Sequence, residues 1–254
     1  MRGAFWRLYL KELKGSLNYT ILLAFGVGWL IFLPTQKLNW GSEIVFGLSF
    51  IPLLLLPVYI LIKGFLSFRS EWKSDTVYSL LSLPVPGWYI LLAKLLAAMT
   101  ILTGLSIIFI IGIYLDSRLI ISWTVLTFVP RNFGIGIYLK MLLCMYIISW
   151  FLCVIGYVII QFSYLVSKLF NRFSGFITGV TFLFTLWVVF RIGSIINKLL
   201  FWIPDLKLIT WAYRNQILHH DIAYINISPF IGIIIASIGL FFVSAWLLEN
   251  VLEI

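Results

Sequence analysis

Six long stretches without a charged residue constrain the fold of this chain more than any other feature. Each has about 18 residues or more, enough for a helix rising 1.5 Å per residue to cross about 30 Å of hydrocarbon. Backbone amides in lipid must pair within a helix or a closed barrel, and these stretches lack the alternation of barrel strands. The sequence therefore predicts an all-α, polytopic membrane protein with about six transmembrane helices. The stretches are residues 15–36, 44–62, 95–115, 141–166, 173–190 and 222–248.

Charged residues are too rare for an ordinary soluble domain. They make up 11% of the 254 residues, whereas 62% are hydrophobic; soluble domains carry about 25% charged residues. We expect a single transmembrane domain over residues 1–254. Its predicted spans lie near residues 17–34, 44–66, 89–114, 140–166, 173–192 and 224–247.

Residues 1–14 have the pattern of an amphipathic elbow helix at the membrane surface. At 100° per residue, Arg7, Lys11 and Lys14 fall on one narrow stripe, and the aromatic residues fall on the apolar arc. The alternative is a basic flank of the first span. Lys94, near the start of the third span, is expected to reach the lipid headgroups with its long side chain. The predicted membrane-interface residues are Phe5, Trp6, Arg7, Lys11, Lys14 and Lys94.

The excess of positive charge indicates a membrane partner rather than nucleic acid. The formal net charge is +9, and the Lys and Arg residues flank the spans, where anionic lipid headgroups would meet them. Basic residues are densest at the N-terminus and in the loops after the second and fourth spans. The positive-inside rule then places both termini in the cytoplasm.

Residues 194–221 are too polar for a span and too apolar for a free loop. We expect one or two short helices there, interfacial or re-entrant at the outer face. His219, His220 and Asp221 lie at its end. Without further His or Cys nearby, an ordinary polar loop is the better interpretation, and no metal site is predicted. Residues 119–130 form a further apolar run that is too short to span unless it is re-entrant.

The chain carries no recognisable catalytic motif. There is no paired-carboxylate motif, His-Glu-x-x-His zinc site or Gly-x-Ser-x-Gly elbow, and no phosphate-binding loop for ATP. No catalytic residue and no bound cofactor are therefore predicted. Two small-residue patterns would allow close helix packing. These are Gly175 with Gly179 in the fifth span and Gly232 with Ala236 in the sixth.

The segment from Glu71 to Lys94 carries a family-like pattern. An acidic residue is followed by Thr, a Leu-Leu pair, Pro-Val and an Ile-Leu-x-x-Lys entry into the third span. It resembles the cytoplasmic loop of permease subunits of type-2 ATP-binding-cassette exporters. The residues of the pattern are Glu71, Thr76, Leu80, Leu81, Pro84, Val85, Ile90, Leu91 and Lys94.

The resemblance implies an exporter permease in a cell membrane, of bacterial type, that dimerises with a second copy or a sister chain. Each permease would dock a separate cytoplasmic ATPase subunit, which would bind the ATP and Mg. Residues 68–87 would form the coupling segment, with a short helix contacting the ATPase. The coupling residues implied are Arg69, Glu71, Lys73, Asp75, Thr76, Leu80, Leu81 and Pro84.

Two other classes of function stay open at this point. One is an intramembrane enzyme, such as a lipid-modifying transferase or a CAAX-type protease, which the lack of buried Glu/His pairs disfavours. The other is a non-transporting membrane sensor or assembly factor. The cargo of a transporter is not readable from these residues.

Overall fold

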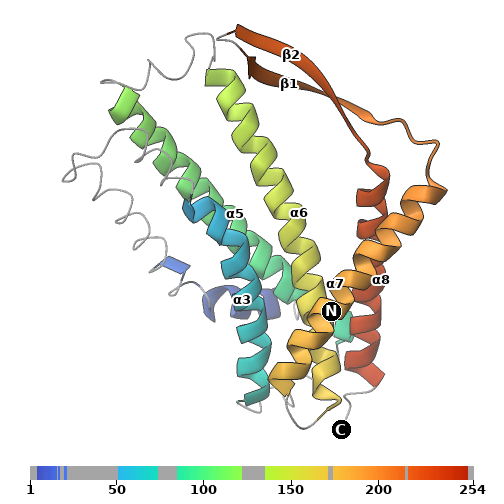
Figure 1. Cartoon of the computed structure of the whole chain (residues 1–254). Coiled ribbons are helices and arrows are strands. Elements are labelled where there is room, and N and C mark those ends of the chain that lie inside the picture. The colour runs from blue at the N-terminus through green and yellow to red at the C-terminus, as the bar shows by residue number, and fades with distance from the viewer. Residues whose placement is uncertain are drawn as a thin grey trace.

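The computed structural model describes residues 5–15, 17, 20–21, 51–73, 85–121, 135–170, 174–214 and 217–250. These residues form long helices, a short N-terminal helix (residues 5–15) and one β-hairpin (Figure 1). The long helices are α3 (Ile51–Lys73), α5 (Gly87–Ile121), α6 (Ile135–Lys168), α7 (Ser174–Leu199) and α8 (Ser228–Asn250).

Four of the described helices contain segments long and apolar enough to cross a membrane. These segments are Gly87–Ile111, Tyr146–Lys168, Ser174–Leu199 and Ser228–Asn250. Their outward surfaces carry large apolar side chains, such as the exposed Phe184 and Trp187 of α7, as lipid-facing helices do. The chain is thus a mainly helical membrane protein. The first predicted span, near residues 17–34, lies almost entirely outside the described residues.

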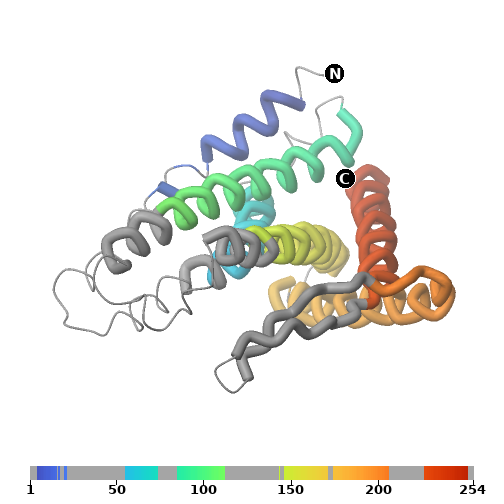
Figure 2. The backbone as a smooth tube through the Cα atoms, turned by 90° about the horizontal axis from the view of Figure 1, so that it is seen from above, coloured from blue at the N-terminus to red at the C-terminus, as the bar shows by residue number. Residues whose placement is uncertain are grey.

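The long helices alternate in direction, so their ends gather at two levels (Figure 1). We call one level the basal end; there α3, α6 and α8 finish, and α5 and α7 begin. The N-terminal helix lies near this end and runs beside α5 when seen from above (Figure 2). The basal end therefore brings together segments that are far apart in the sequence.

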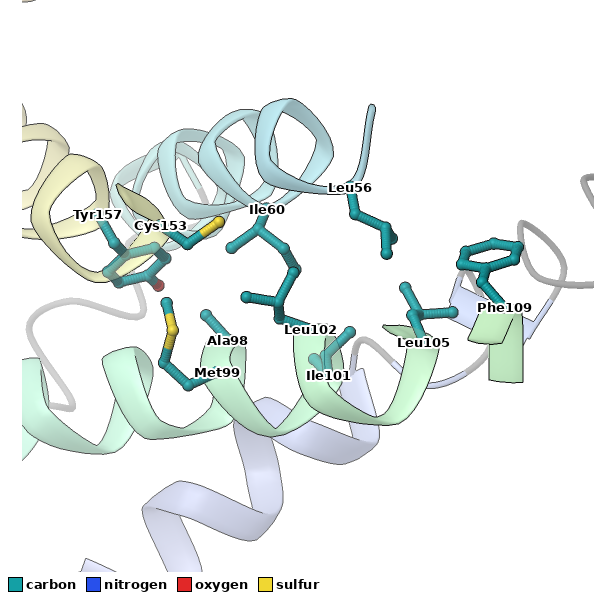
Figure 3. Close-up of a cluster of buried hydrophobic side chains, with 10 residues drawn as sticks. All are labelled: Leu56, Ile60, Ala98, Met99, Ile101, Leu102, Leu105, Phe109, Cys153 and Tyr157. Carbon is teal, nitrogen blue, oxygen red and sulfur yellow. The ribbon is translucent and has the colours of Figure 1, made fainter. Parts of the chain in front are cut away.

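Helix α6 is central, because it contacts α3, α5, α7 and α8. One apolar cluster fills the space between α3, α5 and α6 (Figure 3); Ile60, Leu102 and Tyr157 belong to it. A second cluster at the basal end joins the N-terminal helix to the bundle through Leu8, which is buried among residues that include Leu91. The basal elements are thus packed into one core.

A β-hairpin joins α7 to α8, which corrects the all-α prediction. Strand β1 (Leu206–Arg214) pairs antiparallel with β2 (Ile217–Ile225), in the register that sets Leu206 opposite Ile225. Short helices are predicted in residues 194–221, but α7 continues to Leu199, and Pro204 lies just beyond its end, where a helix would be interrupted. The residues that follow are rich in β-branched and aromatic types, which favour strands.

Candidate functional site

Lys94 of α5 is the centre of a buried charge cluster at the basal end. Its side chain is only 2% exposed, yet its ammonium group lies 2.8 Å from Glu12 Oε1 and 2.9 Å from Glu71 Oε1. A third contact, at 3.0 Å, joins Lys94 Nζ to Ser67 Oγ. A lysine ammonium has three donors, and these three acceptors satisfy all of them.

Three separate elements supply the cluster, which we define as Glu12, Ser67, Glu71 and Lys94. Glu12 comes from the N-terminal helix, and Ser67 and Glu71 come from α3, four residues apart and so on one face of it. The Ser67 hydroxyl donates to Glu12 Oε2 at 3.2 Å. The cluster therefore ties the N-terminal helix and the end of α3 to the start of α5.

Apolar and aromatic groups enclose the cluster. The Lys94 ammonium lies 5.1 Å from the centre of the Phe68 ring, a cation–π distance. Phe68 itself is buried and packs against Tyr164 of α6. Buried ionisable groups beside a membrane are costly and mark functional sites by default, which makes this cluster the leading candidate site.

The two carboxyl groups of the cluster are not equivalent. Burial raises the pKa of Glu71 above its ordinary value, and the charge of Glu12 adds to this rise against the attraction of Lys94. Burial also acts to raise the pKa of Glu12, but the charge and hydrogen bonds of its neighbours, above all Lys94, outweigh it and leave that pKa lowered. Both groups lie outside the four candidate spans. Glu71 is thus the carboxyl that holds a proton more readily.

The expectation that Lys94 reaches the headgroups is corrected by this geometry. The Lys94 ammonium group points into the protein because the carboxylates of Glu12 and Glu71 lie within reach and compensate its charge. Lipid headgroups are therefore not needed to neutralise it. Among the other predicted interface residues, Phe5 packs against the protein: the centres of its ring and of the Tyr89 ring lie 5.6 Å apart in an edge-to-face arrangement. The other four are exposed: Trp6, Arg7, Lys11 and Lys14.

The predicted coupling residues divide into three groups. Arg69 and Lys73 are exposed at the end of α3. Glu71, between them, points into the cluster instead. Nearby, the Lys168 ammonium of α6 lies 5.0 Å from the centre of the Trp72 ring. The remaining predicted coupling residues, Asp75, Thr76, Leu80, Leu81 and Pro84, lie outside the described residues.

The two small-residue patterns are placed differently. A Cβ atom added to Gly232 of α8 would lie 2.8 Å from Gly193 Cα of α7, and Ala236 is buried one turn further along. Gly175 and Gly179 have no atom within 4 Å of such a Cβ in the described part of the chain. Close backbone contact between α7 and α8 therefore involves Gly232 together with Gly193, which the sequence analysis does not single out.

Two acidic residues at the basal end were missed by sequence reasoning. Glu12 is the single acidic residue among positions 1–14, and at 100° per residue it falls beside Leu8, away from the basic stripe. That lone acid on an apolar arc was an available signal. Glu249, near the end of α8, accepts a hydrogen bond from the Gly87 backbone N–H. It thereby caps the first turn of α5, where a carboxylate is favoured.

Comparison of the chain with protein-family models, with curated proteins and with solved structures found no match. Strand β2 carries His219, His220 and Asp221, and within the described residues no group of three His, Cys, Asp or Glu is placed to hold a metal ion. The charge cluster and the surface around it are therefore the features of the described residues that bear on function.

Proposed function

We propose that this chain is the membrane-spanning permease subunit of an ATP-driven exporter of the ATP-binding-cassette type. In this proposal it has six spans, an N-terminal helix at the membrane surface and both termini in the cytoplasm of a bacterial cell. Two permease chains, identical or sister, form the transport path. A separate cytoplasmic ATPase supplies the ATP and Mg chemistry.

The observation that carries the proposal is the charge cluster, which connects the N-terminal helix and α3 to α5 at the basal end. Helix α3 ends and helix α5 begins at the basal end (Figure 1), and the family-like pattern starts there at Glu71. Through Lys94, a displacement of the α3 end would act on α5 and on the N-terminal helix together. A partner that pushes on this end could therefore move a span, which is what an ATP-driven permease requires.

The exposed basic surface beside the cluster is the proposed docking site. Arg69 and Lys73 flank Glu71 on α3 and point outward. Since Glu71 is paired with Lys94, its role in this proposal is to position the end of α3, while Arg69 and Lys73 contact the ATPase. The residues that contact the partner are therefore different from the residue that holds the end of α3 in place.

A charge-reversal pair tests the proposal. The double variant Arg69→Glu/Lys73→Glu is purified from its native membranes and compared with wild type for co-purification of an ATPase identified by mass spectrometry and by ATP hydrolysis. We expect normal membrane insertion and loss of the ATPase. A matched control is Arg191→Glu/Lys198→Glu, which makes the same charge change at exposed positions of α7 toward the opposite end.

The outcomes separate the classes of function. An ATPase retained by the control but lost from the basal variant supports the permease assignment. If the wild-type chain purifies from its own membranes without any ATPase, the assignment is wrong, and a membrane sensor or assembly factor becomes the better description.

A further inference from the structure

Among the described residues, the charge cluster contains two carboxyl groups and one cation in direct contact with both of them, Lys94. Glu12 Oε1 and Glu71 Oε1 both lie within 2.9 Å of the same nitrogen, Lys94 Nζ. With every group ionised, these three side chains would carry one net negative charge. The carboxylates are only 20% and 12% exposed, so water does little to offset their mutual repulsion.

One bound proton would remove this imbalance. With a proton on one carboxyl group, the three side chains together carry no net charge. The protonated carboxyl group can then donate a hydrogen bond to the other. Two carboxyl groups that share a confined site commonly behave in this way, because both cannot ionise at once. We propose that Glu12 and Glu71 form a buried proton-binding site that holds a single proton beside Lys94 and docks the N-terminal helix most tightly in that state. This inference depends on the cluster alone and goes beyond the proposed transport function.

The other ionisable groups around the pair favour Glu71 as the proton carrier. Lys63 of α3 interacts with Glu12 through its charge and donates a hydrogen bond to Thr20 at 3.2 Å. Tyr157 and Tyr164 of α6 interact electrostatically with the pair, and as neutral phenols they add no charge to the site. The electrostatics of the site agree, since the pKa of Glu71 is raised and that of Glu12 is lowered.

Two further basic residues lie at the edge of the pair. Arg69 of α3 interacts with Tyr164, which itself interacts with Glu71, and Lys168 of α6 lies over the rings of Trp72 and Tyr164. The Arg69 side chain is exposed, so water screens its charge. Neither residue replaces Lys94 as the central cation.

The proton controls how firmly the N-terminal helix is held. Glu12 joins residues 5–15 to the described bundle through hydrogen bonds with Lys94 and Ser67. Loss of the shared proton sets two carboxylates against each other and weakens this attachment. Protonation of both carboxyl groups weakens it too, because Lys94 is then buried without a negative partner. Docking is therefore tightest when one proton is bound.

Infrared spectroscopy of the full chain in lipid nanodiscs tests for the proton directly. A protonated carboxyl group has a carbonyl stretch that a carboxylate lacks. In a pH titration of wild type, we expect one such band to persist above about pH 5, where ordinary glutamates have ionised. Either Glu71→Gln or Glu12→Gln should abolish this band, because the remaining carboxyl then pairs with Lys94 as a carboxylate.

The control variant for this titration is Glu249→Gln, which removes a carboxyl group of the basal end that is not in the cluster. It should keep the persistent band. Absence of that band from wild type would overturn the proposal, whatever the variants do. Persistence of the band in either cluster variant would also overturn it, since the proton would then not be shared by this pair.

Hydrogen exchange gives a second measurement, and its first part uses wild-type protein alone. After correction for the intrinsic pH dependence of exchange, amides of residues 5–15 in wild type should lose protection as the persistent band disappears. In Glu71→Gln, which mimics the protonated state, their protection should not change over the same pH range. Wild-type protection that is independent of pH would contradict the link between the proton and the helix.

Discussion

The Lys94 ammonium lies 2.8 Å from Glu12 Oε1, although 82 residues separate the two in the sequence. This ion pair joins the N-terminal helix to α5, and Glu71 completes it from α3. A lysine two turns into an apolar helix is thus neutralised inside the protein. Unfolding measurements can therefore test how much this ion pair contributes to the stability of the fold.

Replacing Lys94 with Met should strongly destabilise the protein. Two carboxyl groups would lose their cation in a buried site, and breaking a buried ion pair from one side typically costs about 3–5 kcal/mol. Thermal unfolding in detergent, followed by the loss of helical circular dichroism, measures the change. The triple variant Lys94→Met/Glu12→Gln/Glu71→Gln should recover much of the loss, because no unpaired charge is left behind. A single Lys94→Met variant as stable as wild type would contradict the structural role of the cluster.

The stability of the cluster should depend on pH in a way that follows from its two carboxyl groups. The pKa of Glu71 is raised in the folded protein, so its contribution is complete below the ordinary glutamate pKa of 4.5 and is lost as pH rises through the folded value. The pKa of Glu12 is lowered, so its contribution is complete above 4.5 and is lost as pH falls through its folded value. The combined stabilisation is therefore greatest near pH 4.5.

The difference in stability between Glu71→Gln and wild type isolates one side of this dependence. The variant cannot lose the proton, so it should gain stability relative to wild type as the pH is raised from 4.5 toward 8. Unfolding midpoints of both proteins across that range give the result. A difference that stays constant with pH would show that Glu71 does not titrate there.

Gly232→Ala should separate α7 from α8. The new methyl group would lie 2.8 Å from Gly193 Cα and 2.9 Å from Ile196 Cβ, closer than carbon atoms pack. Overpacking of this kind costs about 1–3 kcal/mol. The matched control is Gly179→Ala in α7, where nothing lies within 4 Å among the described residues. That change should be neutral or stabilising by up to about 1 kcal/mol, because alanine favours a helix more than glycine does. Equal effects of both changes on thermal unfolding would argue against this contact.

Glu249→Ala should loosen the first turn of α5. The Glu249 carboxylate accepts a hydrogen bond from the Gly87 N–H, and loss of a helix N-terminal cap costs about 0.5–2 kcal/mol. Glu249→Gln keeps an acceptor oxygen but loses the charge, so its effect should be smaller. Hydrogen exchange at residues 87–90 reports the local opening. If the two variants have the same effect, the charge, rather than the hydrogen bond, is what matters at this helix end.

The sequence by itself determined that this is a membrane protein built mainly of helices, because the capacity to cross a bilayer depends on local hydrophobicity. Runs such as 95–115 and 222–248 carry that information without reference to any other part of the chain. The aromatic and basic composition of residues 1–14 likewise indicated an amphipathic helix. Strands β1 and β2 were not predicted from the sequence, because their mixture of apolar and polar residues fits an interfacial helix as well as a hairpin.

Only the tertiary structure decided which groups meet. The direction of the Lys94 side chain depends on whether carboxylates stand within reach, and Glu12 and Glu71 are brought there by the packing of two other helices. In the same way, Gly232 matters because Gly193 lies opposite it on a neighbouring helix. Contacts of this kind depend on how whole helices pack, and no local pattern of residues specifies them.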